Sequence, residues 1–153
     1  KKLDMDRLSE YLERSRKALD ELIGKGSMSL TEAAIALGVS TSRLRQRLGT
    51  ERSLYGIKQG RQWRVPMFQL DSPGGSKKAR ARNQRLVRNI DKVLPEVPVD
   101  VHPLAVRSFF LTENSDLVIP SATDPDDEQP VSPIAWLSAG NPPDDVIALA
   151  KEL

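Results

Sequence analysis

Apolar residues recur at helical spacing near the start of the chain. Between residues 3 and 23 they lie at spacings that bring them to one side of a helix: Leu8, Leu12, Leu19, Leu22 and Ile23. Charged side chains fill the remaining faces, so the pattern predicts one amphipathic helix that ends at Gly24. Such a helix can pack on the residues that follow or pair with a second copy. A stripe this short favours packing within the chain.

A second pattern, over residues 29–48, predicts two short helices that meet at a tight corner. Six apolar residues can bury between them: Ala33, Ala34, Leu37, Val39, Leu44 and Leu48. Gly38 stands where the chain leaves the first helix, a position that favours positive φ. Ser40 stands where a side-chain oxygen would cap the second helix. This is the helix-turn-helix pattern, whose second helix lies in the DNA major groove. The alternative is an ordinary corner in an α-helical domain.

Residues 53–66 change to the alternation that is typical of strands. Apolar runs at 54–57 and 63–65 flank a turn at 58–61 that contains Gly60, and Pro66 stops the second run. The pattern predicts a two-stranded hairpin. A hairpin directly after a helix-turn-helix is a wing, and it strengthens the DNA-binding interpretation.

The exposed positions of the second helix and of the hairpin are basic or polar, and such groups contact bases and phosphates. On the helix they are Thr41, Ser42, Arg43, Arg45, Gln46 and Arg47. At the hairpin tip, Lys58 and Arg61 are placed to reach a phosphate or the neighbouring minor groove. Trp63 is interpreted as a core anchor beneath the hairpin rather than as a base-stacking residue.

Residues 72–89 are interpreted as a basic linker. Residues 71–76 have turn composition, and basic residues follow them: Lys77, Lys78, Arg80, Arg82, Arg85 and Arg88. Two interpretations stay open. The segment either binds the DNA backbone, which adds Lys77, Lys78, Arg80 and Arg82 to the candidate DNA-binding residues, or is a solvated linker that happens to be basic.

From Asn89 onward the chain is again apolar and rich in proline. Its patterns predict helices at residues 89–94, 103–111, 132–137 and 143–153. Residues 121–130 are acidic and lack apolar periodicity, which predicts a mobile loop.

Charge divides the chain into two halves. The 153 residues carry a net charge of +2, but residues 1–90 hold 20 lysines and arginines against nine acidic residues, whereas residues 91–153 hold three against 12. The basic half suits nucleic acid, because cationic surface releases the counterions of the phosphate backbone. DNA would repel the acidic half, which we expect to bind a protein unless its charges serve solubility alone.

Several classes of function are excluded by composition. The chain has no cysteine, and its single histidine, His102, lacks a partner histidine, so we expect neither a metal site nor a cofactor. No glycine-rich phosphate loop or evident carboxylate pair supports an enzyme. No apolar run approaches the roughly 20 residues that span a membrane, and no signal peptide is visible, so we expect a cytoplasmic protein.

Residues 28–70 resemble the winged helices of excisionases and of regulators related to the MerR family. The resemblance rests on Ala33-Ala34, Leu37-Gly38-Val39-Ser40, Leu44 and the segment from Gly60-Arg61 to Arg64-Val65-Pro66. It implies a DNA-binding domain without saying which DNA sequence is bound.

Residues 101–153 are similar to the C-terminal domain of the Xre/MbcA/ParS-like antitoxins, whose partner toxins carry the RES domain. The shared motif is Pro133-x-x-Trp136-Leu137 followed by Gly140, Pro143, Val146 and Leu149-Ala150. The resemblance implies that this region covers the active-site entrance of an NAD-depleting RES toxin. It places toxin contact, or its packing support, at Trp136, Leu137, Val146, Leu149, Ala150 and Lys151. The family's DNA-binding half is an Xre-like helical bundle, from which residues 28–70 depart.

Together these features predict a mainly α-helical fold: a winged helix-turn-helix with a small β-hairpin plus a small C-terminal α-helical domain. The expected divisions are an N-terminal helix at 1–25, the DNA-binding domain at 26–71, the linker at 72–89 and a toxin-binding domain at 90–153. The expected function is an antitoxin of a type II system that binds operator double-stranded DNA as a homodimer and neutralises a RES-domain toxin. The alternative is an excisionase-like architectural protein, or a plain repressor, whose C-terminal half serves dimerisation.

Overall fold

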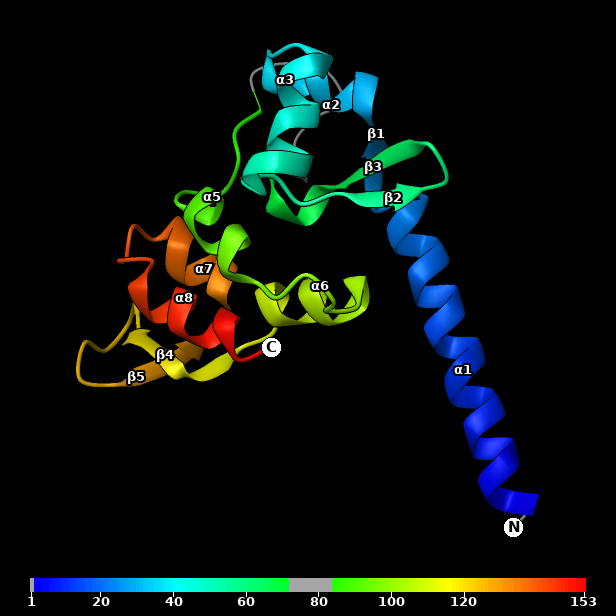
Figure 1. The fold of residues 1–153 in the computed structure, drawn as a ribbon. Coiled ribbons are helices and arrows are strands. Elements are labelled where there is room, and N and C mark those ends of the chain that lie inside the picture. Colours follow the sequence, from blue (N-terminus) through cyan, green and yellow to red (C-terminus); the bar gives the residue numbers. More distant parts are fainter. Residues whose placement is uncertain (1, 72–83) are drawn as a thin grey trace.

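The computed structural model describes residues 2–71 and 84–153, with side chains from residue 4 onward, and it is mainly α-helical as predicted (Figure 1). In chain order its elements are α1 (Lys2–Ile23), β1 (Ser27–Ser29), α2 (Leu30–Leu37), α3 (Thr41–Gln46), the π-helical turn η1 (Arg47–Glu51), β2 (Ile57–Gln59), β3 (Gln62–Pro66), the 3-10 turn η2 (Met67–Gln69), α5 (Ile90–Val93), the 3-10 turn η3 (Leu94–Glu96), α6 (Pro103–Leu111), β4 (Asn114–Pro120), β5 (Glu128–Val131), α7 (Pro133–Ser138) and α8 (Asp144–Lys151).

The helix α1 forms where its periodicity predicts, but it leaves the body of the molecule (Figure 1). Leu22, near its C-terminal end, is 2% exposed and belongs to the core, whereas Met5 is 72% exposed. The expectation that the helix packs within the chain is therefore wrong for most of its length. At 1.5 Å per residue, a helix of 22 residues is about 33 Å long, and only its last turns meet other elements.

The corner between α2 and α3 follows the predicted local signals. Gly38 ends α2 with φ +68°. Two residues later, Ser40 caps α3 by accepting a hydrogen bond from the Arg43 N–H at 3.1 Å. A capping box also starts α2, in which Ser29 and Glu32 each accept a backbone hydrogen bond from the other residue. These caps fix where both helices begin, and the corner buries Ala33 and Leu44 completely.

The predicted hairpin is present as β2 and β3, joined by a turn in which Gly60 has φ +59°. A third strand, β1, was not predicted. It pairs antiparallel with β3 from Ser27 opposite Pro66 to Ser29 opposite Arg64, so the sheet order is β1-β3-β2. Its sequence, Ser-Met-Ser, alternates polar and apolar residues, but a segment of three residues with one apolar side chain is too short to indicate a strand.

The C-terminal region is not purely α-helical, which corrects the prediction for residues 90–153. Between α6 and α7 it contains the antiparallel hairpin β4–β5. Residues 128–130, expected to belong to a mobile acidic loop, lie in β5, where Pro130 stands opposite Val118. In a sheet of two strands both strands are edge strands, and an edge strand tolerates a proline whose missing N–H would face solvent. The β5 strand is also mostly exposed, so it needs no alternation of apolar and polar residues.

Two apolar clusters hold the described residues together. One lies among α2, α3 and β3 and contains Leu44 and Val65. The larger cluster fills the C-terminal region, but it also includes Leu22 and Phe68, residues that precede that region. The Phe68 ring stacks on Phe110 of α6, with ring centroids 5.8 Å apart. The basic and acidic parts of the chain are thus packed against each other.

Candidate nucleic-acid interface

One exposed face of α3 adjoins the start of α2 and the hairpin. The three elements enclose a groove of about 370 Å³, lined by Ser29, Leu30, Thr31, Thr41, Arg45, Arg61, Gln62, Trp63 and Arg64. Thr41 and Arg45 are one helical turn apart, so they share a face of α3. Two of the predicted α3 residues and one predicted hairpin residue therefore meet at one surface, which carries the charge of Arg45 and Arg61.

Ser42 and Gln46 are also exposed on α3. They do not line the groove, but they extend its polar surface along the helix. Gln46 Oε1 accepts a hydrogen bond of 3.4 Å from Arg43 Nη1. The structure thus leaves both predicted residues accessible to a partner.

The other two arginines of this segment are engaged within the protein. Arg43 Nη1 lies 2.5 Å from Glu51 Oε1, and this ion pair holds the pKa of the Glu51 carboxyl below its usual value. Arg47 is half-buried, and its Nε and Nη2 donate to Oγ and O of Ser53 at 3.0 and 3.2 Å. Arg43 and Arg47 thus secure η1, whereas Arg45 faces the groove.

The hairpin presents its two predicted cations differently. Arg61 is exposed at the turn and lines the groove. Lys58 lies over the Trp63 ring, with its Nζ 5.4 Å from the ring centroid. Trp63 packs against the cluster among α2, α3 and β3, which supports its interpretation as an anchor. The Trp63 ring also lies close to the backbone of Gly56. A Cβ at this position would lie 2.9 Å from the ring, so the glycine leaves room for the tryptophan.

Arg64 lines the groove as well, although it was not among the predicted residues. Its Nε donates to Ile23 O and Ser27 Oγ, and its Nη2 to Ser27 O, each at 3.0 Å. The side chain therefore fixes the end of α1 to the sheet. Nothing in the local sequence indicates this contact, because it joins residues 41 positions apart.

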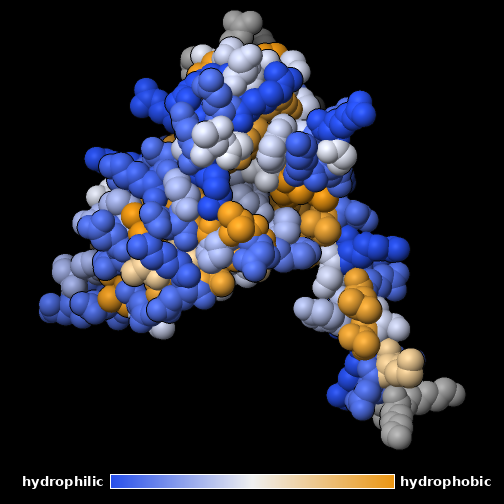
Figure 2. Space-filling view, in the orientation of Figure 1, coloured by the Kyte–Doolittle hydropathy of each residue, from blue (hydrophilic) through white to orange (hydrophobic). Residues whose placement is uncertain are grey.

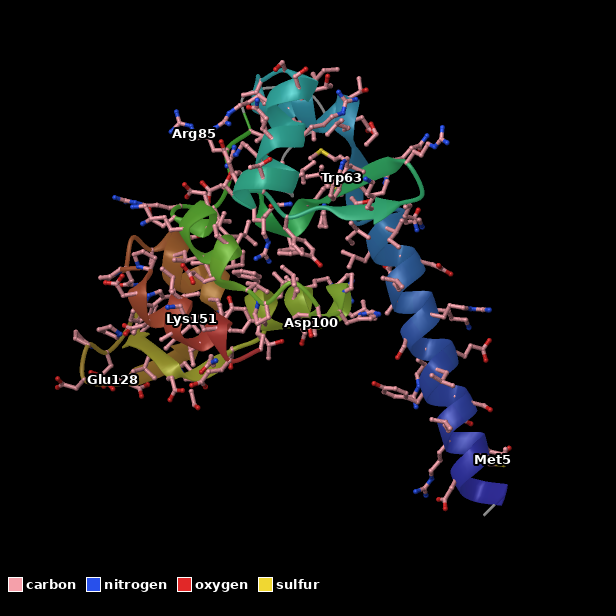
Figure 3. The ribbon with its side chains drawn as sticks, in the orientation of Figure 1. Met5, Trp63, Arg85, Asp100, Glu128 and Lys151 are labelled. Carbon is pink, nitrogen blue, oxygen red and sulfur yellow. The ribbon has the colours of Figure 1, made fainter. Side chains whose placement is uncertain are left out.

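The predicted linker cations Lys77, Lys78, Arg80 and Arg82 lie outside the described residues. Where the chain is described again, it returns along α2: the Gln84 N–H donates to Ala36 O at 2.9 Å. Arg85 is exposed, and in Figure 3 it lies on the opposite side of the α2–α3 region from Trp63. Residue 85 is therefore not part of the groove surface.

The candidate toxin-binding residues have a different environment. Leu137, Val146 and Ala150 are all 0% exposed and belong to the larger apolar cluster of the C-terminal region. Trp136 is half-buried, and its Nε1 donates to Pro142 O at 2.8 Å, which closes the turn before α8. These four residues support the surface rather than form it.

Two candidate residues on α8 reach the surface to different degrees. Leu149 is half-buried against the larger cluster, and Lys151 is exposed, with its Nζ 3.8 Å from Glu96 Oε2. Acidic residues gather at the end of the β4–β5 hairpin, where Figure 3 labels Glu128. Its acidic residues are all exposed: Asp124, Asp126, Asp127 and Glu128.

His102 has a structural role, since its Nδ1 accepts a hydrogen bond from the Leu104 N–H and caps α6. Among the described residues, no group of three or more acidic or histidine side chains is placed to hold a metal ion. Within those same residues, no helix has both the length and the apolar character to cross a membrane. No protein-family model, curated protein or solved structure matches the chain.

Proposed function

We propose that the chain is a DNA-binding regulator in which α2, α3 and the β2–β3 hairpin act as a winged helix-turn-helix. The observation that carries this proposal is the groove at which Thr41, Arg45 and Arg61 meet from two elements. A helix whose exposed face is basic and polar fits the major groove, and a cation on an adjacent hairpin fits a phosphate or the minor groove. The surplus of basic residues over the first 90 positions supplies the attraction for the backbone.

Within this interface the arginines have separate roles. Arg45 faces the groove, so its guanidinium reads base edges, with guanine O6 and N7 as its natural bidentate partner. Arg43 is held by Glu51, and Arg47 by Ser53, so these two position the helix. Ser42 and Gln46 add hydrogen-bonding groups beside Arg45.

The test is binding to duplex DNA from the promoter of the chain's own gene, measured at several salt concentrations. We expect Arg45→Ala to weaken specific binding by about 1–3 kcal/mol, and Arg43→Ala to weaken it less. The matched control is Lys92→Ala, which removes the same charge from an exposed position on α5. Equal losses for Arg45→Ala and Lys92→Ala would mean that α3 does not read bases.

The acidic C-terminal region completes the proposed function as the part that binds a protein. Its resemblance to antitoxins of RES-domain toxins supports a partner of that kind, and its exposed acidic hairpin would be repelled by DNA. In this role DNA binding places the antitoxin on its own promoter. The acidic region then restrains an NAD-depleting toxin.

Coexpression of the full chain with a RES-domain protein encoded beside its gene tests this second step. We expect the two proteins to purify together and growth arrest by the toxin to be relieved. Arg45→Ala serves as the control, because it weakens DNA binding while leaving the C-terminal region intact. Failure of the chain to bind or neutralise the toxin would favour the plain repressor, and an integrase gene as neighbour would favour the excisionase-like reading.

A further inference from the structure

The projecting part of α1 carries an apolar stripe with no partner inside the chain. The stripe follows alternating steps of three and four residues: Met5, Leu8, Leu12, Ser15, Leu19 and Leu22. Leu8 and Leu12 are 56% and 58% exposed, and Tyr11 beside them is 63% exposed. Steps of three and four place one edge of a helix against another helix in a two-stranded coil.

The exposed stripe coincides with the part of α1 that leaves the body. Every side chain from residue 4 to residue 14 is exposed, and Figure 2 shows apolar surface on this length of the helix. In proteins most of the stability of a helix comes from packing its apolar face. We therefore expect a partner surface along the exposed part of α1.

The buried end of the same stripe limits how a partner helix can lie. Leu22 is in the core and Leu19 is half-buried, and α1 contacts α6 there. A second helix running parallel would reach residues 19–22 at the level where α6 already covers the stripe. An antiparallel helix that contacts α1 between residues 5 and 15 avoids this overlap, because residues 19–22 of both copies then lie outside the contact.

We propose that the partner is a second copy of this chain, and that two α1 helices pair antiparallel with Leu8 of each beside Leu12 of the other. Met5 then lies opposite Ser15. Charge also favours the antiparallel direction, because residues 4–9 carry a net charge of −1 and come level with residues 11–16, which carry +1. The contact is symmetric, as expected of a dimer with a two-fold axis. It does not depend on DNA binding.

Sedimentation of the full chain, without DNA and over a range of concentrations, tests the pairing. We expect a dimer that Leu8→Glu with Leu12→Glu converts to a monomer, raising the dissociation constant at least about tenfold. The matched control is Lys17→Glu, which adds a carboxylate on the opposite side of α1 and should leave the dimer intact. A chain that stays monomeric at every concentration overturns the proposal, as does a dimer that the double variant leaves unchanged.

Single cysteines test the orientation, because the chain has none of its own. In the antiparallel register residue 11 of one copy lies near residue 11 of the other, so Tyr11→Cys should form an intermolecular disulfide under mild oxidation. Residue 5 of the two copies lies at opposite ends, so Met5→Cys should not. Cross-linking through Met5→Cys but not through Tyr11→Cys would show a parallel pair and overturn the register. Circular dichroism checks that each variant keeps its fold.

Discussion

The α3 helix and the α7–α8 pair were both singled out by sequence motifs, but their motif residues lie in opposite environments. On α3 the candidates are polar, and Ser42, Arg45 and Gln46 stand in solvent. On α7 and α8 the candidates are mostly apolar, and Leu137 and Val146 are completely buried. A polar motif on a short helix can mark a contact surface directly. An apolar motif instead marks buried core residues, and the exposed residues that bind a partner near them can be found only from the structure.

The largest expected effect is a loss of stability at the buried residues of α7 and α8. Leu137→Ala removes a completely buried side chain from the larger apolar cluster. We expect it to lower the free energy of unfolding by about 2–5 kcal/mol, through lost burial and the cavity left behind. Chemical denaturation of the full chain measures this loss. Leu149→Ala, at a half-buried position of α8, should cost less, and equal costs would contradict the assignment of Leu137 to the core.

The next effect concerns the connection between the two regions. Arg52 follows η1, and its Nη1 and Nη2 donate to Pro95 O and Val97 O at 3.2 and 2.6 Å. Arg52→Met keeps much of the side-chain volume but removes both hydrogen bonds from a charged donor. We expect a loss of unfolding free energy of about 1.5–3 kcal/mol. The exposed Arg85→Met is the control, and if both variants unfold at the same denaturant concentration, the connection contributes nothing.

A smaller effect sharpens the distinction between the arginines of α3. Glu51→Gln removes the carboxylate that pairs with Arg43 and so frees a cation beside the groove. Because solvent screens this exposed ion pair, we expect a rise of only a few-fold in DNA affinity. Glu10→Gln on α1 makes the same change in net charge far from α3. The ion pair does not restrain Arg43 if the two variants gain equally in gel-shift titrations.

The smallest effect is a pH dependence at the start of α2. The backbone N–H and then the hydroxyl of Ser29 hold the pKa of Glu32 below its ordinary value of 4.5. A carboxyl with a lowered folded-state pKa contributes stability that is complete above 4.5 and disappears as the pH falls through the folded value. We therefore expect the unfolding free energy of Glu32→Gln to depend less on pH than that of the parent in acid. Parallel curves for the two proteins would rule out this contribution.

Local signals explain the parts of the fold that were predicted well. Proline at the first helical position and a periodic run behind it mark α6, which spans residues 103–111 as expected. Gly38 and Ser40 mark the corner between α2 and α3 through requirements that lie within a few residues of each position. The strands β1 and β5 could not be found in this way. Their pairing depends on backbone hydrogen bonds to strands elsewhere in the chain, and their sequences are too short and polar to indicate a strand.

The sequence by itself determined the helices with their caps, the hairpin turn and the division into a basic and an acidic part, because each depends on neighbouring residues or on composition alone. Only the tertiary structure decided that Arg45 and Arg61 meet at one groove while Arg43 and Arg47 are held elsewhere. It also decided that α1 leaves the body with its apolar stripe exposed. A side chain's freedom to bind depends on what the distant parts of the chain place beside it, and that information is not local.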